Sequence, residues 1–124
     1  IIPAINDTEI ERILDAAHVA GVREAGYVLL RLPLEVRDLF KEWLEANYPD
    51  RAKHVFKLIR DMRGGKDYDA NWGARMRGAG PYAWTIGRRF ELACERLGIN
   101  AERTKLSTEH FQPPAKGAEQ LTLF

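Results

Sequence analysis

A continuous apolar run at residues 27–30, directly after Gly26, restricts the folds open to this chain. The run has the length of a strand and follows a helical pattern, which is typical of a strand buried on both faces. Residues 1–5 form another short apolar stretch, broken by Pro3. The order strand, helix, strand over residues 1–32 predicts a βαβ unit, the building block of parallel α/β folds.

A unit of two parallel strands cannot cover its own sheet, because a strand buried on both faces needs neighbours. The chain also begins at Ile1, without methionine, in the middle of what reads as a strand. We therefore expect a fragment of a longer protein, cut from a larger sheet or barrel.

The helix between the two expected strands has a clear start and stop. Two capping boxes fit its start equally well, Asn6 with Glu9 and Thr8 with Glu11, and Gly21 ends it. Its apolar stripe consists of Ile10, Ile13, Leu14 and Ala17.

Three further amphipathic helices are predicted after residue 32. One begins at Pro33 and is broken at residues 47–49, with the stripe Val36, Leu39, Phe40, Trp43 and Leu44. The next runs from about Asp50 to a stop at Gly64 and Gly65, with Ala52, Val55, Phe56, Ile59 and Met62 inward. The last runs from Pro81 to Gly98, with Ile86, Phe90, Ala93, Cys94 and Leu97 inward. Residues 66–80 lack periodicity and are predicted to form a loop.

The expected fold class is thus an α+β fragment, a βαβ piece followed by about three helices and an extended tail. Its expected divisions are the βαβ piece at residues 1–32, a helical part at 33–98 and a tail at 99–124. The 124 residues suffice for a single core.

The composition gives no case for a partner bound through bulk charge, and none for a disulfide framework. The net charge is +1, so any basic patch must be local. The lone cysteine, Cys94, cannot form a disulfide framework and is compatible with a reducing compartment. The sequence has no signal peptide and no apolar run of membrane-spanning length. We expect a cytoplasmic protein without a membrane partner.

The loop at residues 60–78 carries the most suggestive chemistry. It combines five basic and three acidic residues with two aromatic side chains on a glycine-rich backbone. Basic groups can hold phosphates and aromatic faces can stack on exposed bases. The loop therefore predicts a site for nucleic acid, including DNA, or for another substrate, at Lys66, Tyr68, Trp72, Arg75 and Arg77.

Two features of this loop leave alternatives open. Trp72 could instead fill the core beneath the loop. Arg75 and Arg77 alternate around Met76, so in an extended segment both would point to one side.

Three stretches, IIPAINDTEIERILDAA, GYVLLRLPLEVRDLF and IRDMRGGKDYDANWGARMRGAGPYA, together resemble the C-terminal part of one bacterial family. These are radical S-adenosylmethionine proteins similar to spore photoproduct lyase, often labelled DNA repair photolyases. The resemblance covers nearly the whole chain. It implies that residues 1–32 are the end of a partial parallel (β/α) barrel and that residues 33–98 are its helical C-terminal extension.

The resemblance also implies a cofactor and a reaction class. In the family, three cysteines spaced Cys-x3-Cys-x2-Cys bind a 4Fe–4S cluster, which cleaves S-adenosylmethionine to a 5′-deoxyadenosyl radical. This chain has one cysteine, so the cluster and S-adenosylmethionine are expected in the parent protein, and no catalytic or metal-binding residue is expected here. The resemblance places Ile5 and Asn6 at the rim of the S-adenosylmethionine pocket. The alternative for Asn6 is a helix cap.

The last five residues closely match the peptide by which bacterial polymerases and repair proteins dock on the sliding clamp. The matching side chains are Gln120, Leu121, Leu123 and Phe124, and a stretch rich in proline, glycine and lysine precedes them. The alternative is that these apolar side chains pack on their own domain as an added strand.

Two functional hypotheses follow. The first is a C-terminal fragment of a radical S-adenosylmethionine enzyme that acts on nucleic acid. The second is a non-catalytic helical module that binds DNA or a protein and is tethered by its terminal peptide.

Overall fold

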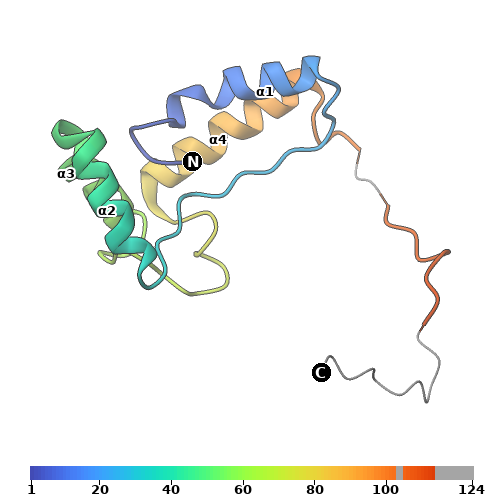
Figure 1. Cartoon of the computed structure of the whole chain (residues 1–124). Coiled ribbons are helices and arrows are strands. Elements are labelled where there is room, and N and C mark those ends of the chain that lie inside the picture. Colours follow the sequence, from blue (N-terminus) through green and yellow to red (C-terminus); the bar gives the residue numbers. More distant parts are fainter. Residues whose placement is uncertain (103–104, 114–124) are drawn as a thin grey trace.

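A computed structural model describes residues 1–102 and 105–113 (Figure 1). A single 3-10 turn and four α-helices make up its regular structure: η1 (Asp7–Glu9), α1 (Ile10–Val19), α2 (Val36–Asn47), α3 (Pro49–Asp61) and α4 (Gly80–Leu97). The helices form two pairs, α1 beside α4 and α2 beside α3, and residues 22–32 run between the pairs as an extended thread (Figure 1). We call residues 22–32 the crossing segment.

The expected α+β fold with a βαβ piece is wrong, because no strand forms within the described residues. One hydrogen-bonded pairing of the expected kind does occur. The amine of Ile1 donates to the carbonyl of Val28 at 2.7 Å, and the amide of Leu30 donates to the carbonyl of Ile1 at 2.9 Å. The pairing stops there, because Pro3 lacks a donor and the chain turns, with the amide of Ile5 bonded to the carbonyl of Ile2.

The apolar run is instead buried between helices. Leu29 and Leu32 are each 1% exposed, and each enters a different hydrophobic cluster. The amide of Leu29 donates to the carbonyl of Met76 at 2.9 Å rather than to a neighbouring strand. A short apolar run between turn signals fits a helix-covered segment as well as a sheet strand, and periodicity alone does not separate the two.

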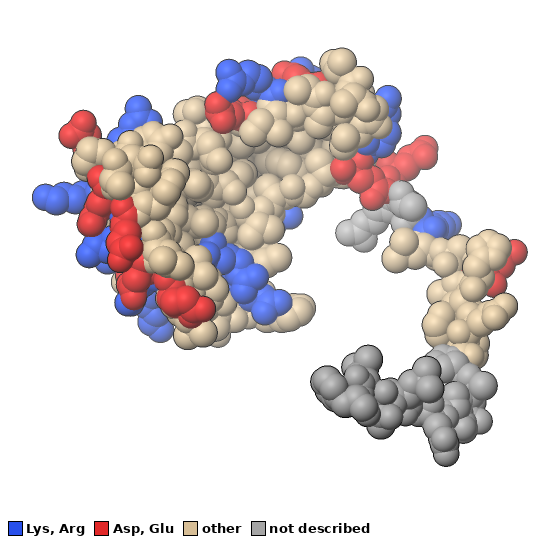
Figure 2. All heavy atoms as spheres, in the orientation of Figure 1, with Lys and Arg blue, Asp and Glu red and all other residues tan. Residues whose placement is uncertain are grey.

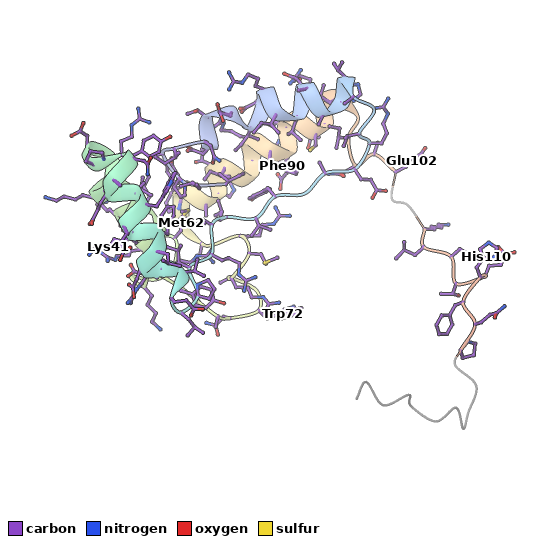
Figure 3. The ribbon with its side chains drawn as sticks, viewed as in Figure 1. Lys41, Met62, Trp72, Phe90, Glu102 and His110 are labelled. Atoms are coloured by element: carbon purple, nitrogen blue, oxygen red, sulfur yellow. The ribbon has the colours of Figure 1, made fainter. Side chains whose placement is uncertain are left out.

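The first hydrophobic cluster lies between α1 and α4. Its buried members include Ile10 and Leu14 from α1, Leu29 from the crossing segment, and Ile86 and Phe90 from α4. Figure 3 shows Phe90 between the two ribbons. Residues on both sides of the expected division at residue 32 thus share one core.

Polar contacts join the same two helices along their length. The contacts pair Tyr82 with Asp7 at 2.5 Å, Arg89 with Glu11 at 2.6 and 2.8 Å, and Arg96 with Asp15 at 2.7 Å. Burial and the hydrogen bond to Asp7 raise the pKa of Tyr82 from 10.0 to about 12. The hydrogen bond from Arg89 holds the pKa of Glu11 below its ordinary value.

The second hydrophobic cluster lies between α2 and α3. All five side chains expected to face inward from the third predicted helix are buried: Ala52, Val55, Phe56, Ile59 and Met62. The predicted stripe of α2 is only partly buried: Leu44 is enclosed, whereas Val36, Leu39 and Trp43 are exposed. The difference arises because α2 packs chiefly on α3 and has a free outer side.

The helix boundaries agree with the sequence pattern apart from their caps. Pro49 and Pro81 lie in the first turns of α3 and α4, and α2 begins three residues after Pro33. Neither predicted capping box forms, since η1 and α1 have no side-chain cap hydrogen bond.

The end of α4 is anchored to the crossing segment. Gly98 takes a left-handed conformation at the helix end, and Ile99, expected in the tail, is buried in the first cluster. Asn100 follows with φ of +65°, and its side-chain amide both accepts from the amide of Ala25 and donates to the carbonyl of Ala25, each at 2.9 Å. Contacts with the helices and the crossing segment therefore continue through Asn100, two residues into the segment that was expected to be the tail.

Within the described part of the chain, no helix is both long and apolar enough to cross a membrane. This agrees with the expected absence of a membrane-spanning helix.

Candidate functional site

The loop between α3 and α4, residues 62–79, is fastened to the crossing segment by one buried arginine. Arg63 is 4% exposed, and its guanidinium donates to the carbonyls of Ala74 at 2.6 Å and Leu30 at 3.2 Å, with Leu29 at 3.5 Å. Burial lowers the pKa of Arg63 below its ordinary value. Backbone carbonyls thus take the place of a carboxylate partner, and the 62–79 loop is held in one position.

The most exposed aromatic side chain of the loop is Trp72, which is 81% exposed. Figure 3 shows it at the outer edge of the loop, directed away from the helices. The guanidinium of Arg75 lies 3.9 Å from the centre of its ring, a cation–π contact. The alternative that Trp72 fills the core is therefore wrong.

The backbone around this pair forms a turn rather than an extended segment. The amides of Ala74 and Arg75 both donate to the carbonyl of Asn71, and the amide of Gly78 donates to the carbonyl of Ala74. Arg75 and Arg77 therefore contact different aromatic rings, and the simple alternation expected around Met76 does not hold.

Arg77 stacks on an aromatic ring that the sequence did not assign to the site. Its guanidinium lies 4.1 Å from the ring centre of Tyr27, in the crossing segment, and the Tyr27 ring also packs on Phe90 at 4.8 Å. A third pair joins Arg31 and Tyr68, whose hydroxyl accepts from the Arg31 guanidinium at 3.1 Å. We call the six side chains of these three pairs the arginine–aromatic surface: Tyr27, Arg31, Tyr68, Trp72, Arg75 and Arg77.

The charge of this surface is not balanced locally. Among the described residues, none of Arg31, Arg75 and Arg77 forms an ion pair, whereas the nearby Arg60 is paired with Asp67 at 2.6 Å. The Nε atoms of Arg31 and Arg75 also have no hydrogen-bond partner there. Figure 2 shows basic side chains gathered beside the loop, with acidic side chains following α2. These two Nε atoms are buried, so what the surface offers to an anion is the positive charge of its three guanidinium groups.

Lys66 is separated from the Trp72 side of the loop. It lines a hollow at the start of α2, together with Tyr68, Asp67, Arg37 and Asp38. Each of the other four predicted loop residues takes part in one of the three pairs, whereas Lys66 shares a hollow with Tyr68 and residues of both charges.

Ile5 and Asn6 lie on different sides of their turn. Ile5 packs on the second cluster, whereas Asn6 borders a hollow of about 300 Å³ between α1 and the crossing segment. The side chain of Asn6 accepts from the amide of Ile2 at 2.7 Å and does not cap a helix. The placement of these two residues at the rim of an S-adenosylmethionine pocket stays a prediction.

Gln120, Leu121, Leu123 and Phe124 lie outside the described residues, so clamp binding stays a prediction. Within residues 1–102 and 105–113, no group of three or more His, Cys, Asp or Glu side chains could hold a metal ion. Cys94 is buried in α4.

The sequence interpretation missed three residues that shape this region: Tyr27, Arg31 and Arg63. Tyr27 was assigned to a strand because of its apolar neighbours, and its contact with Arg77 spans 50 positions of the chain. Arg63 carried one usable signal, since it directly precedes the two glycines that end α3.

No protein-family profile, no curated protein and no solved structure matches this chain. The functional argument is therefore made from the site itself.

Proposed function

We propose that this chain is a helical module that binds single-stranded nucleic acid through the arginine–aromatic surface. The observation that carries the proposal is the exposed Trp72 ring with Arg75 stacked on one face. Proteins that bind single strands combine basic groups along the backbone with aromatic rings on which bases stack.

The pairing of guanidinium groups with rings supports this function in two ways. Each arginine orients an aromatic side chain before any ligand arrives, which lowers the ordering cost of binding. Each guanidinium also lies close enough to its ring to contact the phosphate next to a stacked base. Bases inside a duplex have no free face, so the exposed Trp72 ring suits a single strand better than a double helix.

The test is a binding assay with the full chain and a labelled single-stranded oligonucleotide. Fluorescence anisotropy measures the affinity over a range of salt concentrations. DNA and RNA strands of the same sequence form the two arms. We expect the Arg75→Ala/Arg77→Ala variant to bind more weakly, with a slope of log K against log salt shallower by roughly 1.4, about 0.7 for each lost phosphate contact. Trp72→Ala should weaken binding roughly tenfold through the loss of one stacked base.

The matched control is Arg12→Ala/Lys57→Ala, which removes the same charge from two exposed side chains that pair with Glu9 and Asp61. It should bind as the parent does. Equal affinity and equal salt slope for all variants contradict the proposal for both strand types. Binding that responds to Trp72→Ala but not to salt also contradicts it, because contacts with phosphates make the affinity depend on salt.

We propose further that Gln120, Leu121, Leu123 and Phe124 bind a bacterial sliding clamp. Support comes from the sequence match alone: a glutamine amide and three apolar side chains at the spacing of that peptide. Calorimetry with purified clamp and the full chain should show binding that is lost when the last five residues are deleted. Equal binding after the deletion rules out this role.

Membership of the radical S-adenosylmethionine family is also a proposal, supported by the three resembling stretches of sequence. If the chain belongs to this family, the parent reading frame should encode Cys-x3-Cys-x2-Cys upstream of Ile1. An in-frame methionine directly before Ile1 favours the independent binding module instead.

A further inference from the structure

A second surface feature lies next to the arginine–aromatic surface and shares Tyr27 and Arg77 with it. It is a hollow of about 350 Å³ between the end of the 62–79 loop, the first half of α4 and Tyr27. Its volume falls within the range of small-molecule sites. The hollow combines a floor of glycine and alanine residues with a rim that carries a tryptophan and an arginine.

The floor is made of small residues: Gly78, Ala79, Gly80, Ala83 and Gly87. Two of the glycines are required by close approach. A Cβ at Gly78 would lie 3.2 Å from Met62, at a φ of +68°, and a Cβ at Gly87 would lie 2.8 Å from the hydroxyl of Tyr27. Glycine at these two positions therefore lets Met62 and Tyr27 pack closely beneath the hollow, and no side chain longer than alanine projects from the other residues of its floor.

The rim carries an exposed indole. Trp84 is 70% exposed in α4, where the inward positions are taken by Ala83, Ile86 and Phe90. Packing of the helix does not require a large aromatic side chain at this position. An exposed aromatic ring beside a hollow is a feature of binding surfaces.

The rim also carries one cation that no described carboxylate neutralises. Arg88 forms ion pairs with Glu91 at 3.2 Å and Glu95 at 3.7 Å, whereas Arg77 has only its stacking contact with Tyr27. The Tyr27 ring packs on Phe90 as well, so it is fixed in place. Arg77 therefore belongs both to the arginine–aromatic surface and to the hollow, and it links the two.

We propose that this hollow receives one unstacked base of the bound single strand, with the base on Trp84 and the adjacent phosphate on Arg77. The inference rests on the proposed nucleic-acid function and adds to it a specific place for one base. A strand that crosses the surface from Trp72 to Arg77 would then continue into the hollow.

Two variants test the hollow in the full chain. Trp84→Ala removes the stacking platform, and Ala79→Leu places a larger side chain on the floor while Trp84 is kept. Leu92→Ala is the matched control, since Leu92 is an exposed apolar residue of the same helix that does not line the hollow. Because Ala79 and Trp84 are exposed, we expect all three variants to fold, which circular dichroism checks.

The probes are a labelled single-stranded oligonucleotide and its abasic counterpart of equal length and charge. We expect Trp84→Ala and Ala79→Leu to weaken binding of the normal strand roughly tenfold, the contribution of one stacked base. Binding of the abasic strand should change little in either variant, and Leu92→Ala should bind both strands as the parent does.

The outcomes separate the two proposals. If Trp72→Ala weakens binding but Trp84→Ala and Ala79→Leu do not, the hollow takes no base and the proposed function stands. If the parent binds neither DNA nor RNA, the proposed function fails and the hollow with it. If the variants weaken binding of normal and abasic strands equally, the hollow holds the backbone and the base assignment is overturned.

Discussion

Replacement of Arg63 by methionine should destabilise the fold far more than replacement of any exposed arginine. Methionine matches much of the length of the side chain but cannot donate to the carbonyls of Ala74 and Leu30, which then lose their partner inside the protein. Two hydrogen bonds to a charged group contribute about 1.5–3 kcal/mol each. The relief of a buried charge offsets part of that loss, so we expect a net decrease of about 2–4 kcal/mol in the free energy of unfolding.

Urea denaturation followed by circular dichroism measures this change. With a slope of about 1.5 kcal/mol/M, ordinary for a chain of this size, the midpoint should fall by about 1.3–2.7 M. The matched control is Arg60→Met, three residues earlier, which removes an exposed ion pair with Asp67 and should leave the midpoint nearly unchanged.

A second readout concerns the loop itself. Since Arg63 fastens the 62–79 loop to the crossing segment, Arg63→Met should also make the loop easier to cleave by protease at concentrations of urea that leave the helices folded. The reasoning is refuted if Arg63→Met and Arg60→Met unfold at the same midpoint and are cleaved at the same rate.

Three further predictions follow from single contacts. Gly78→Ala should lower the melting temperature, because the left-handed backbone costs about 1–2 kcal/mol and the new Cβ would lie 3.2 Å from Met62; an unchanged melting temperature contradicts this. Asn100→Asp should destabilise the fold by about 1 kcal/mol near neutral pH, because a carboxylate cannot donate to Ala25, and urea midpoints should show recovery in acid. The folded-state pKa of Tyr82, about 12, exceeds its ordinary 10.0, so its contribution to stability is complete below pH 10 and is lost as the pH rises from about 10 to 12. In melting curves, Tyr82→Phe should lose less stability than the parent over this pH range. If both proteins lose the same stability, the alkaline effect comes from other groups.

Helices were predictable where one face is buried and the other is not. In α3, four of the five buried side chains were identified, and the prediction missed Leu58. The fifth predicted residue, Met62, is buried just after the helix ends. The stripe of α2 was equally regular, yet Leu39 and Trp43 are exposed. Hydrophobic periodicity identifies the face of a helix, but it does not say how much of that face a neighbour covers.

The crossing segment could not be assigned from local sequence. An apolar run with burial on both sides fits a central strand, and it also fits a thread between two pairs of helices. Which of these forms is decided by distant residues, namely the carbonyl of Met76 and the guanidinium of Arg63. A turn after Pro3 then limits the pairing with Ile1.

The candidate site was predictable in composition but not in geometry. The composition of the loop pointed to its arginines and its tryptophan. A glycine-rich stretch with many charged residues is unlikely to be buried in a core, so its aromatic side chains were expected at the surface. The partner of Arg77, in contrast, is Tyr27, which lies 50 positions away and belonged to the apolar run. Trp84 could not be identified from the sequence, because the sequence of a helix does not show which of its outward residues border a hollow.

The placement of the tryptophans has a practical consequence for optical measurements. The chain has three, at positions 43, 72 and 84, and all of them lie at the surface. Indole emission depends on contact with water, so the emission of these residues should already resemble that of solvated indole before the protein unfolds. Intrinsic fluorescence of this chain is therefore a poor monitor of its core and a direct monitor of what touches Trp72 and Trp84.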